Sequence, residues 1–507
     1  MKKLALLLSL LMLISVFAVA CATPGDGEDT TPADAAITTP SSGDGSTPVD
    51  TTEVDIYADL PEGNFDGFQF DILTSPVGWT DYENFVIDSD IGAIGEPVND
   101  ELYNRNLLIA DQFGITIEER VVTGDTEAKT IIATQALAGD KSFDMFAPSA
   151  AFGASLATEG YLVDMSELSS IDFEKPWWDV EYNESVSLGP KTYVAFGDLS
   201  LVYAGAVFCM AFNSDMLTDH GLEDPYDLYN SGNWTYDKVY EMASAVSSDE
   251  DGDGTYTTLD SDVFGLVGHS NQIIHMVLAS GATIVSKDNA GVPVLNQNNE
   301  YFYNVFSNVM EKFVNVESSV WAKVFPSNYK EYDSTVTIEG YLQIFNEGRA
   351  LFTTNVMAAF KAHRDAEVAY RIIEFPKYDS KQTDYISVRY SGGRGISMIN
   401  GFNDDELERN ATIIENMAAY NHQYVIPKFI EVTLYYKYAK DQASLDMLET
   451  ILSRTGFSDL AYLYDWGSIN SLTNNLIASG RTNISGAIKT IQSKLSKEIE
   501  NVLEKYE

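Results

Sequence analysis

Cysteine and positive charge are both scarce in this chain. Only Cys21 and Cys209 carry a thiol among 507 residues, so at most one disulfide can form. Lys and Arg number 31 against 76 Asp and Glu, which gives a formal net charge of −45. Such a negative field repels nucleic-acid phosphates and anionic lipid. We therefore expect no nucleic-acid partner, whereas the charge is compatible with a neutral or cationic ligand.

Recognisable catalytic motifs are also lacking. The sequence has no H-E-x-x-H, no G-x-S-x-G, no phosphate-binding loop and no C-x-x-C. His269 and His275 are six residues apart, a spacing that does not place them on one helical face. We predict a binding protein and not an enzyme. A tethered glycoside hydrolase stays the rival interpretation, because 76 acidic residues always include pairs of carboxylates.

The N-terminal segment of the chain has the features of an export signal. Lys2 and Lys3 precede an apolar run over 4–20, a pattern typical of a secretory signal peptide over 1–20. The segment "AVAC" at 18–21 resembles a bacterial lipobox, with Ala18 where Leu is usual. The resemblance implies a lipidated Cys21 at the extracytoplasmic face of the cell membrane. A soluble exported protein or a short helical anchor would be the alternatives. Cys209 is then a lone thiol, which we expect to be buried.

Residues 21–64 are rich in Thr, Pro, Gly, Ser and Asp and have almost nothing to bury, so they predict a flexible acidic tether. The rest of the chain is long enough for more than one hydrophobic core. Strands are expected at 68–73, 115–122 and 143–146, with helices between them at 99–113, capped by Asn99, and at 125–138. This alternation predicts a parallel α/β sheet covered on both faces, with ligands beyond the carboxyl ends of its strands.

Four later segments carry a resemblance to a known family. They are "FDMFAPSAAFGASLATEGYLVDMSEL" (143–168), "FCMAFNSDMLTDHGLEDPYDLYNSGNWTYDKVYEMA" (208–243), "YLQIFNEGRALFTTNV" (341–356) and "IIEFPKYDSKQTDY" (372–385). In this order they resemble the extracellular solute-binding proteins of ABC importers that are related to maltose-binding proteins. The resemblance extends from Phe68 to the C-terminus.

That resemblance implies an α/β, two-lobed periplasmic-binding-protein-like fold with hinge crossovers and a helical C-terminal region. Lobe 1 would comprise 65–205 and 385–425, and lobe 2 would comprise 206–384 and 426–507. It also implies a monomer whose lobes close on a small solute and which delivers the solute to a membrane permease of an ABC transporter. We expect an oligosaccharide ligand; a peptide is the alternative.

An acidic loop, "DEDGDGTYTTLD" at 249–260, has the spacing of a calcium loop. The expected Ca²⁺ ligands are Asp249, Asp251, Asp253, Thr255 and Asp260. A helix precedes the loop but a strand is expected after it, so the paired helices of a calcium sensor are missing. We predict a structural Ca²⁺ ion in lobe 2; the alternative is a solvated acidic turn.

Candidate ligand contacts combine aromatic rings with polar groups that follow strands, because sugars present both a C–H face and hydroxyls. Each of these side chains could instead pack in the core, cap a helix or pair with a carboxylate. The predicted set is Trp79, Ser149, Trp177, Trp178, His269, Asn271, Asn355 and Arg394.

Overall fold

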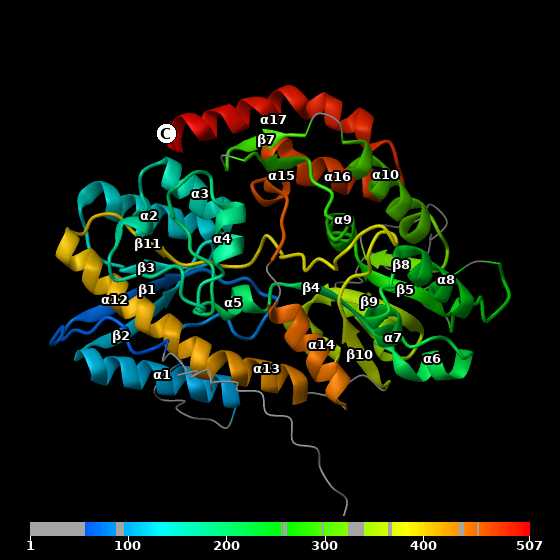
Figure 1. Cartoon of the computed structure of the whole chain (residues 1–507), viewed down its shortest axis with the longest axis horizontal. Coiled ribbons are helices and arrows are strands. Elements are labelled where there is room, and N and C mark those ends of the chain that lie inside the picture. The colour runs from blue at the N-terminus through cyan, green and yellow to red at the C-terminus, as the bar shows by residue number, and fades with distance from the viewer. Residues whose placement is uncertain are drawn as a thin grey trace, which may run out of the picture. The chain divides into compact units, whose positions relative to one another are not determined.

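The computed structural model describes residues 56–87, 96–254, 256, 261–289, 291–296, 299–322, 339–363, 368–435, 441–453 and 456–506. All of them belong to one compact unit, Ile56–Glu507 (Figure 1). The predicted signal peptide, the lipidation site Cys21 and all of the tether before Ile56 lie outside the described residues.

The first lobe is built on a four-stranded sheet in the order β11-β3-β1-β2. Its strands are β1 (Gln69–Thr74), β2 (Thr116–Val121), β3 (Met145–Phe146) and β11 (Ser397–Met398). β1, β2 and β3 are parallel, whereas β11 returns from far along the chain and pairs antiparallel with β3. The predicted alternation of strands and helices is confirmed here.

Both faces of this sheet are covered, because side chains alternate along β1. Phe70 and Ile72 face a core shared with α1 (Pro97–Phe113) and α12 (Asp404–Tyr420). Leu73 faces the opposite core, shared with α2 (Asp125–Ala138) and α3 (Ala150–Thr158). The sheet is therefore buried on both sides, as the sequence predicts.

The start of α1 corrects one expectation. Asn99 is not the cap: the helix begins at Pro97, and the Glu96 carboxylate accepts a hydrogen bond from the Asn99 backbone N–H (2.7 Å). Proline fits the first helical turn because its missing N–H is not needed there. The predicted end is correct, since Gly114 adopts φ 68° just past the helix.

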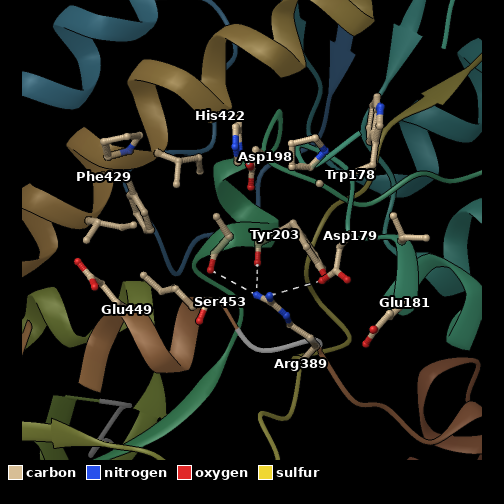
Figure 2. A pocket seen from close by; sticks show the side chains of 18 of the residues that line it. Trp178, Asp179, Glu181, Asp198, Tyr203, Arg389, His422, Phe429, Glu449 and Ser453 are labelled. Carbon is tan, nitrogen blue, oxygen red and sulfur yellow. Dashed lines mark hydrogen bonds and ion pairs between the residues drawn. The ribbon is translucent and has the colours of Figure 1, made fainter. Parts of the chain in front are cut away.

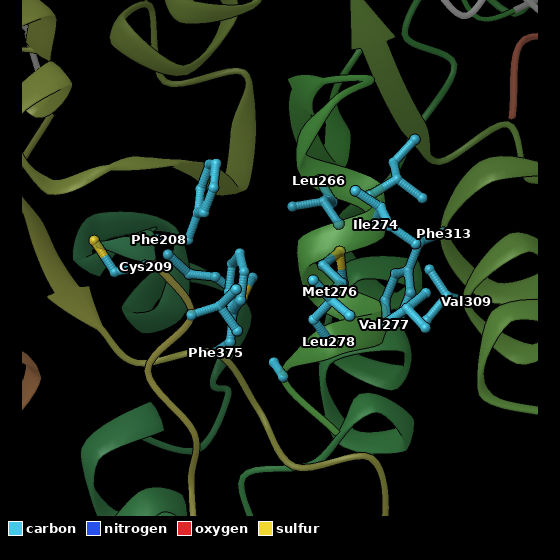
Figure 3. Packing of buried hydrophobic residues seen from close by; sticks show 14 of the residues in the cluster. Phe208, Cys209, Leu266, Ile274, Met276, Val277, Leu278, Val309, Phe313 and Phe375 are labelled. Atoms are coloured by element: carbon cyan, nitrogen blue, oxygen red, sulfur yellow. The ribbon is translucent and has the colours of Figure 1, made fainter. Parts of the chain in front are cut away.

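The second lobe has a five-stranded sheet in the order β10-β4-β9-β5-β8. Its strands are β4 (Phe208–Asn213), β5 (Phe264–His269), β8 (Ser319–Ala322), β9 (Ala350–Val356) and β10 (Tyr370–Ile373). β5, β8 and β9 are parallel, and β4 is antiparallel to both of its neighbours. Figure 3 shows Phe208, Leu266 and Phe313 among the side chains of its core. Cys209 is buried there, which confirms its predicted packing role.

Helices and a short hairpin surround this sheet. They are α6 (Ser214–His220), α7 (Pro225–Asn230), α8 (Tyr236–Val246), α9 (Gln272–Leu278), α10 (Glu300–Val309), α11 (Glu339–Asn346), β6 (Val285–Lys287) and β7 (Pro293–Leu295).

Among the described residues, two of the segments that run between the sheets pair with each other. Residues 205–208 lead into β4, and residues 387–390 lead back toward β11. They are antiparallel: Tyr390 N–H donates to Ala206 O (2.8 Å), and Phe208 N–H donates to Val388 O (2.9 Å). We call this pair the crossover ribbon. Because its backbone is extended, Arg389 and Tyr390 project from opposite faces.

The remaining helices complete the two lobes and the C-terminal region. They are α4 (Val180–Val186), α5 (Leu201–Ala204), α13 (Ile426–Tyr435), α14 (Gln442–Ser453), α15 (Leu460–Leu463), α16 (Ile469–Ala478) and α17 (Ile484–Tyr506). α17 packs on α10 and α16 and also reaches α3 of the first lobe (Figure 1). Among the described residues, no helix is both long and apolar enough to cross a bilayer. The residue boundaries of the lobes stay a prediction.

Candidate functional site

The carboxyl ends of the first-lobe strands bring three polar side chains together. Ser75 follows β1, and its hydroxyl donates to Asp125 Oδ1 (2.8 Å) at the start of α2. Ser149 follows β3 and caps α3 by accepting from the Phe152 N–H (3.4 Å). This is the edge at which ligands of open α/β sheets bind.

Arg394 reaches the same edge from the chain that returns to β11. It pairs with Ser149 through an isolated β-bridge, and its Nη2 donates to Asp125 Oδ1 (3.3 Å). Arg394 is only 8% exposed, yet its Nε and Nη1 have no hydrogen-bond partner within the described part of the chain. A buried donor without a partner costs about 1–3 kcal/mol, so two such donors are suited to a ligand's oxygen atoms.

Aromatic rings continue this group into the second lobe. The Trp79 ring lies edge-on to Tyr390 (centroids 5.8 Å apart), and Tyr390 in turn contacts His275 on α9 (6.2 Å) and Phe208 (5.5 Å). We call the combined set the strand-end cluster. Its members are Ser75, Trp79, Asp125, Ser149, Phe208, His275, Tyr390 and Arg394.

Burial controls ionisation in the strand-end cluster. It lowers the pKa of His275 to about 4, while the imidazole Nδ1 is hydrogen-bonded to Asn271 O (2.8 Å). Burial also raises the pKa of Tyr390, against the opposing charge of Arg394. At neutral pH both rings are uncharged, and they offer flat apolar surfaces with polar edges.

Three other predicted residues gather at the matching edge of the second sheet. His269 ends β5, and its Nδ1 lies 2.6 Å from Asn271 Oδ1 in the turn before α9. Asn355 lies near the end of β9, and its Nδ2 donates to Tyr341 OH (3.4 Å). Gln272 connects the ends of β5 and β9, because its side-chain oxygen accepts hydrogen bonds from the His269 N–H and from the Thr354 hydroxyl. Ligand contact by His269, Asn271 and Asn355 stays a prediction.

Trp177 and Trp178 lie elsewhere, in the core of the first lobe. Their indole N–H groups donate to the two oxygens of Glu415 on α12, at 3.0 and 2.9 Å. Trp177 has no exposed surface and stacks on Tyr57. Burial raises the pKa of Glu415 to about 7, even though these hydrogen bonds favour its ionised form. The structure thus brings Trp79, Ser149 and Arg394 together, but not these two tryptophans with them.

A cavity of about 1100 Å³ opens beside Trp178, on the Arg389 side of the crossover ribbon (Figure 2). We call it the hinge cavity. Its walls come from the segment around α4 and α5, from α13 and from α14. It shares no residue with the strand-end cluster and does not lie beyond the strand ends. Despite its size we therefore take the strand-end cluster, and not this cavity, as the candidate site.

The acidic loop is described in part. Asp249, Asp251 and Asp253 bring their carboxylate oxygens within 4.8 Å of one another. The Asp249 carboxylate accepts backbone N–H bonds from Gly254 (2.8 Å) and Gly252 (2.7 Å), which lower its pKa. Hard oxygen donors this close together fit Ca²⁺. Thr255 and Asp260 lie outside the described residues, so the five-ligand site stays a prediction.

No protein-family model and no curated protein sequence matches the chain. Solved structures do. A cyclo/maltodextrin-binding protein complexed with maltotetraose superposes with a TM-score of 0.54 at 14% identity, over 86% of this chain and 99% of that one. An ABC substrate-binding protein from Listeria monocytogenes in complex with cycloalternan gives 0.52 at 13% identity, over 86% and 100%. A maltose/maltodextrin-binding domain from Bdellovibrio bacteriovorus bound to maltotriose also gives 0.52 at 13%, over 85% and 100%.

The fold is that of maltose-binding-type solute-binding proteins of ABC importers. The two-lobed α/β fold predicted from the sequence is thereby confirmed. Within this solute-binding fold, the sequence did not indicate Asp125, His275 or Tyr390. A signal was present for two of them: Asp125 follows a predicted strand, and His275 lies one helical turn after Asn271. Tyr390 could be placed only once its partner in the crossover ribbon was known.

Proposed function

We propose that the chain is the substrate-binding lipoprotein of an ABC importer, which captures an oligosaccharide at the strand-end cluster and passes it unchanged to a membrane permease. The observation that carries this proposal is Arg394. Two of its buried N–H donors are unpartnered within the described residues, beside the rings of Trp79 and Tyr390, at an edge to which both lobes contribute.

The chemistry of this edge suits a neutral sugar. Aromatic rings can stack on the C–H faces of pyranoses, and Arg394 and Asp125 can donate to and accept from hydroxyl groups. His275 adds a polar group without charge, because burial keeps its imidazole neutral. The fold supports the same function, since the solved proteins of this type named above hold oligosaccharides.

Capture would involve both lobes. Trp79, Asp125 and Arg394 belong to the first-lobe edge, whereas His275 belongs to α9 of the second. A ligand that touches all of them favours the arrangement in which the lobes approach each other, because only that arrangement makes every contact. Export and lipid attachment at Cys21 would hold the protein at the membrane that contains the permease.

The direct test measures oligosaccharide binding to the protein and then recovers the bound sugar to check that it is intact. The protein is secreted as the Cys21→Ser variant, so that no lipid is attached, and is titrated calorimetrically against a broad oligosaccharide panel that includes maltotriose, maltotetraose and cycloalternan. A matched panel of tripeptides and tetrapeptides is run in parallel. We expect saturable binding of oligosaccharides only, and chromatography should return the bound sugar intact. Binding of peptides alone, or a cleaved sugar, would refute the proposal.

Variants locate the site. Arg394→Met keeps the side-chain stem but removes the donors, and should weaken binding about tenfold or more, since a hydrogen bond to a charged group contributes about 1.5–3 kcal/mol. Trp79→Ala should weaken binding similarly. Tyr424→Ala, an exposed aromatic residue outside the cluster, is the matched control and should bind like the parent protein.

A further inference from the structure

The hinge cavity is a built site that the proposed function leaves unused. Trp178, Asp179 and Tyr203 form its first-lobe wall, and Arg389 points into it from the crossover ribbon (Figure 2). The opposite walls are the apolar sides of α13 and α14. Their lining residues include Ile426, Phe429, Ile430, Leu445 and Leu452. At about 1100 Å³ the cavity can enclose a molecule larger than a monosaccharide.

The polar groups around Arg389 in the cavity are largely paired with each other, although Arg389 Nε has no hydrogen-bond partner within the described residues. Arg389 lies over the Tyr203 ring (4.4 Å to the centroid), donates to Tyr203 O (3.3 Å) and is 3.7 Å from Asp179. Asp179 also accepts from the Tyr203 hydroxyl (2.6 Å). His422 Nδ1 lies 2.6 Å from Asp198. The guanidinium charge of Arg389 is thereby offset within the protein.

Negative charge dominates the rest of the lining. Glu181 on α4 and Glu449 on α14 stand on opposite sides of the cavity, and both are exposed to solvent (Figure 2). Glu431 also lines it and pairs with Lys428 (2.6 Å). Carboxylates therefore outnumber cations around an apolar interior, in a chain whose net charge is already −45. Such a field concentrates cations and repels anions.

We propose that the hinge cavity is a second ligand site, which takes an amphipathic organic cation: an alkyl or aryl body with an ammonium group. The apolar body would pack against Phe429, Ile430 and Leu452, and the ammonium group would lie between Glu181 and Glu449. This site is independent of the strand-end cluster, because the crossover ribbon separates Arg389 from Tyr390.

The test uses two probes that share an alkyl chain and differ in charge. Decyltrimethylammonium and decyl sulfate are titrated calorimetrically, below their micelle concentrations, into the Cys21→Ser protein. We expect one saturable site for the ammonium probe and at least tenfold weaker binding of the sulfate. Equal affinity for the two probes, or binding of the ammonium probe that does not saturate, would overturn the proposal.

Variants place the probe in the cavity. Glu181→Gln with Glu449→Gln should weaken ammonium binding about fivefold, as expected for the loss of two exposed charges. Asp446→Asn with Glu500→Gln removes the same charge from exposed positions outside the lining and is the matched control, which should bind within about twofold of the parent. Leu445→Trp places a larger side chain among the apolar lining residues and should weaken ammonium binding. Thermal melts confirm that each variant is folded.

Two further variants separate this site from the proposed sugar site. Trp79→Ala and Arg394→Met change the strand-end cluster and should leave ammonium binding unchanged. A loss of ammonium binding in these variants, with none in Leu445→Trp, would place the probe at the strand-end cluster and refute the second site. This result does not depend on whether an oligosaccharide binds.

Discussion

Glu415 is a buried carboxyl group whose ionisation should reduce the stability of the folded chain. It is 2% exposed and accepts hydrogen bonds from Trp177, Trp178 and the Asp172 N–H (3.3 Å). Three donors favour the charged form, but the loss of solvent outweighs them and raises the pKa of Glu415 to about 7.

The direction follows from proton binding. Between pH 4.5, the ordinary pKa of Glu, and about 7, the folded chain keeps a proton on Glu415 that the unfolded chain releases. The free energy of unfolding therefore falls as pH rises through this window and is constant, for this group, above it. A shift from 4.5 to about 7 corresponds to about 3 kcal/mol.

Urea unfolding of Glu415→Gln at several pH values measures this term. Tryptophan fluorescence is the readout, because Trp177 and Trp178 contact Glu415. The substituted amide has only one acceptor oxygen and leaves one indole N–H poorly paired, so the variant loses stability at every pH, and the slope against pH is the quantity compared. Between pH 4.5 and 8 the parent should lose about 3 kcal/mol more than the variant.

The comparison cancels the other buried titrating groups. Asp144 and Asp459, whose pKa values burial raises to about 6, are present in both proteins. Asp405→Asn, an exposed carboxylate on the same helix, controls for the loss of one negative charge. Parallel pH dependences for the parent and Glu415→Gln would show that Glu415 does not keep its proton in the folded chain.

Three further predictions follow from other elements. In the capping box of α12, the Asn403 and Glu406 side chains each accept a hydrogen bond from the other residue's backbone N–H. Asn403→Ala removes this box and should lower the free energy of urea unfolding by about 1 kcal/mol. An unchanged urea midpoint would contradict this prediction. Because burial lowers the pKa of His275 to about 4, calorimetric affinity for the sugar should be constant from pH 8 to about 5; a fall centred near 6.5 would show a solvated imidazole. If Ca²⁺ binds the acidic loop, a chelator should lower the melting temperature of the parent protein but not that of Asp251→Asn. Equal melting temperatures of the parent with and without Ca²⁺ would show that the loop binds no stabilising Ca²⁺ ion.

The fold was predictable because its signals are local. The alternation of strands and helices and the glycine that ends α1 are both visible in short stretches of sequence. These short-range patterns predict the first-lobe sheet. The cap of α1 was missed because Glu caps a helix rarely, and the sequence offered Asn99 close by. Local signals therefore gave the elements to within a few residues.

The site depends on contacts that no local pattern contains. Trp177 and Trp178 have the composition of a sugar platform, but Glu415, which binds their indole groups, lies 238 and 237 residues further along the chain. Arg394 was identified because glycines flank it, whereas its partner Asp125 is 269 residues away. Long-range pairing decides which polar and aromatic residues are available to a ligand.

The crossover ribbon makes chain length itself a constraint. Arg389 and Tyr390 are neighbours in sequence but serve opposite sides of the ribbon, so inserting or deleting a single residue between Ile386 and Tyr390 would exchange their directions. The guanidinium would then lose Asp179 and Tyr203, and the phenol would lose His275. Most surface loops tolerate such changes of length; homologues that keep both sides of the ribbon should preserve the number of residues here even where they change the residue types.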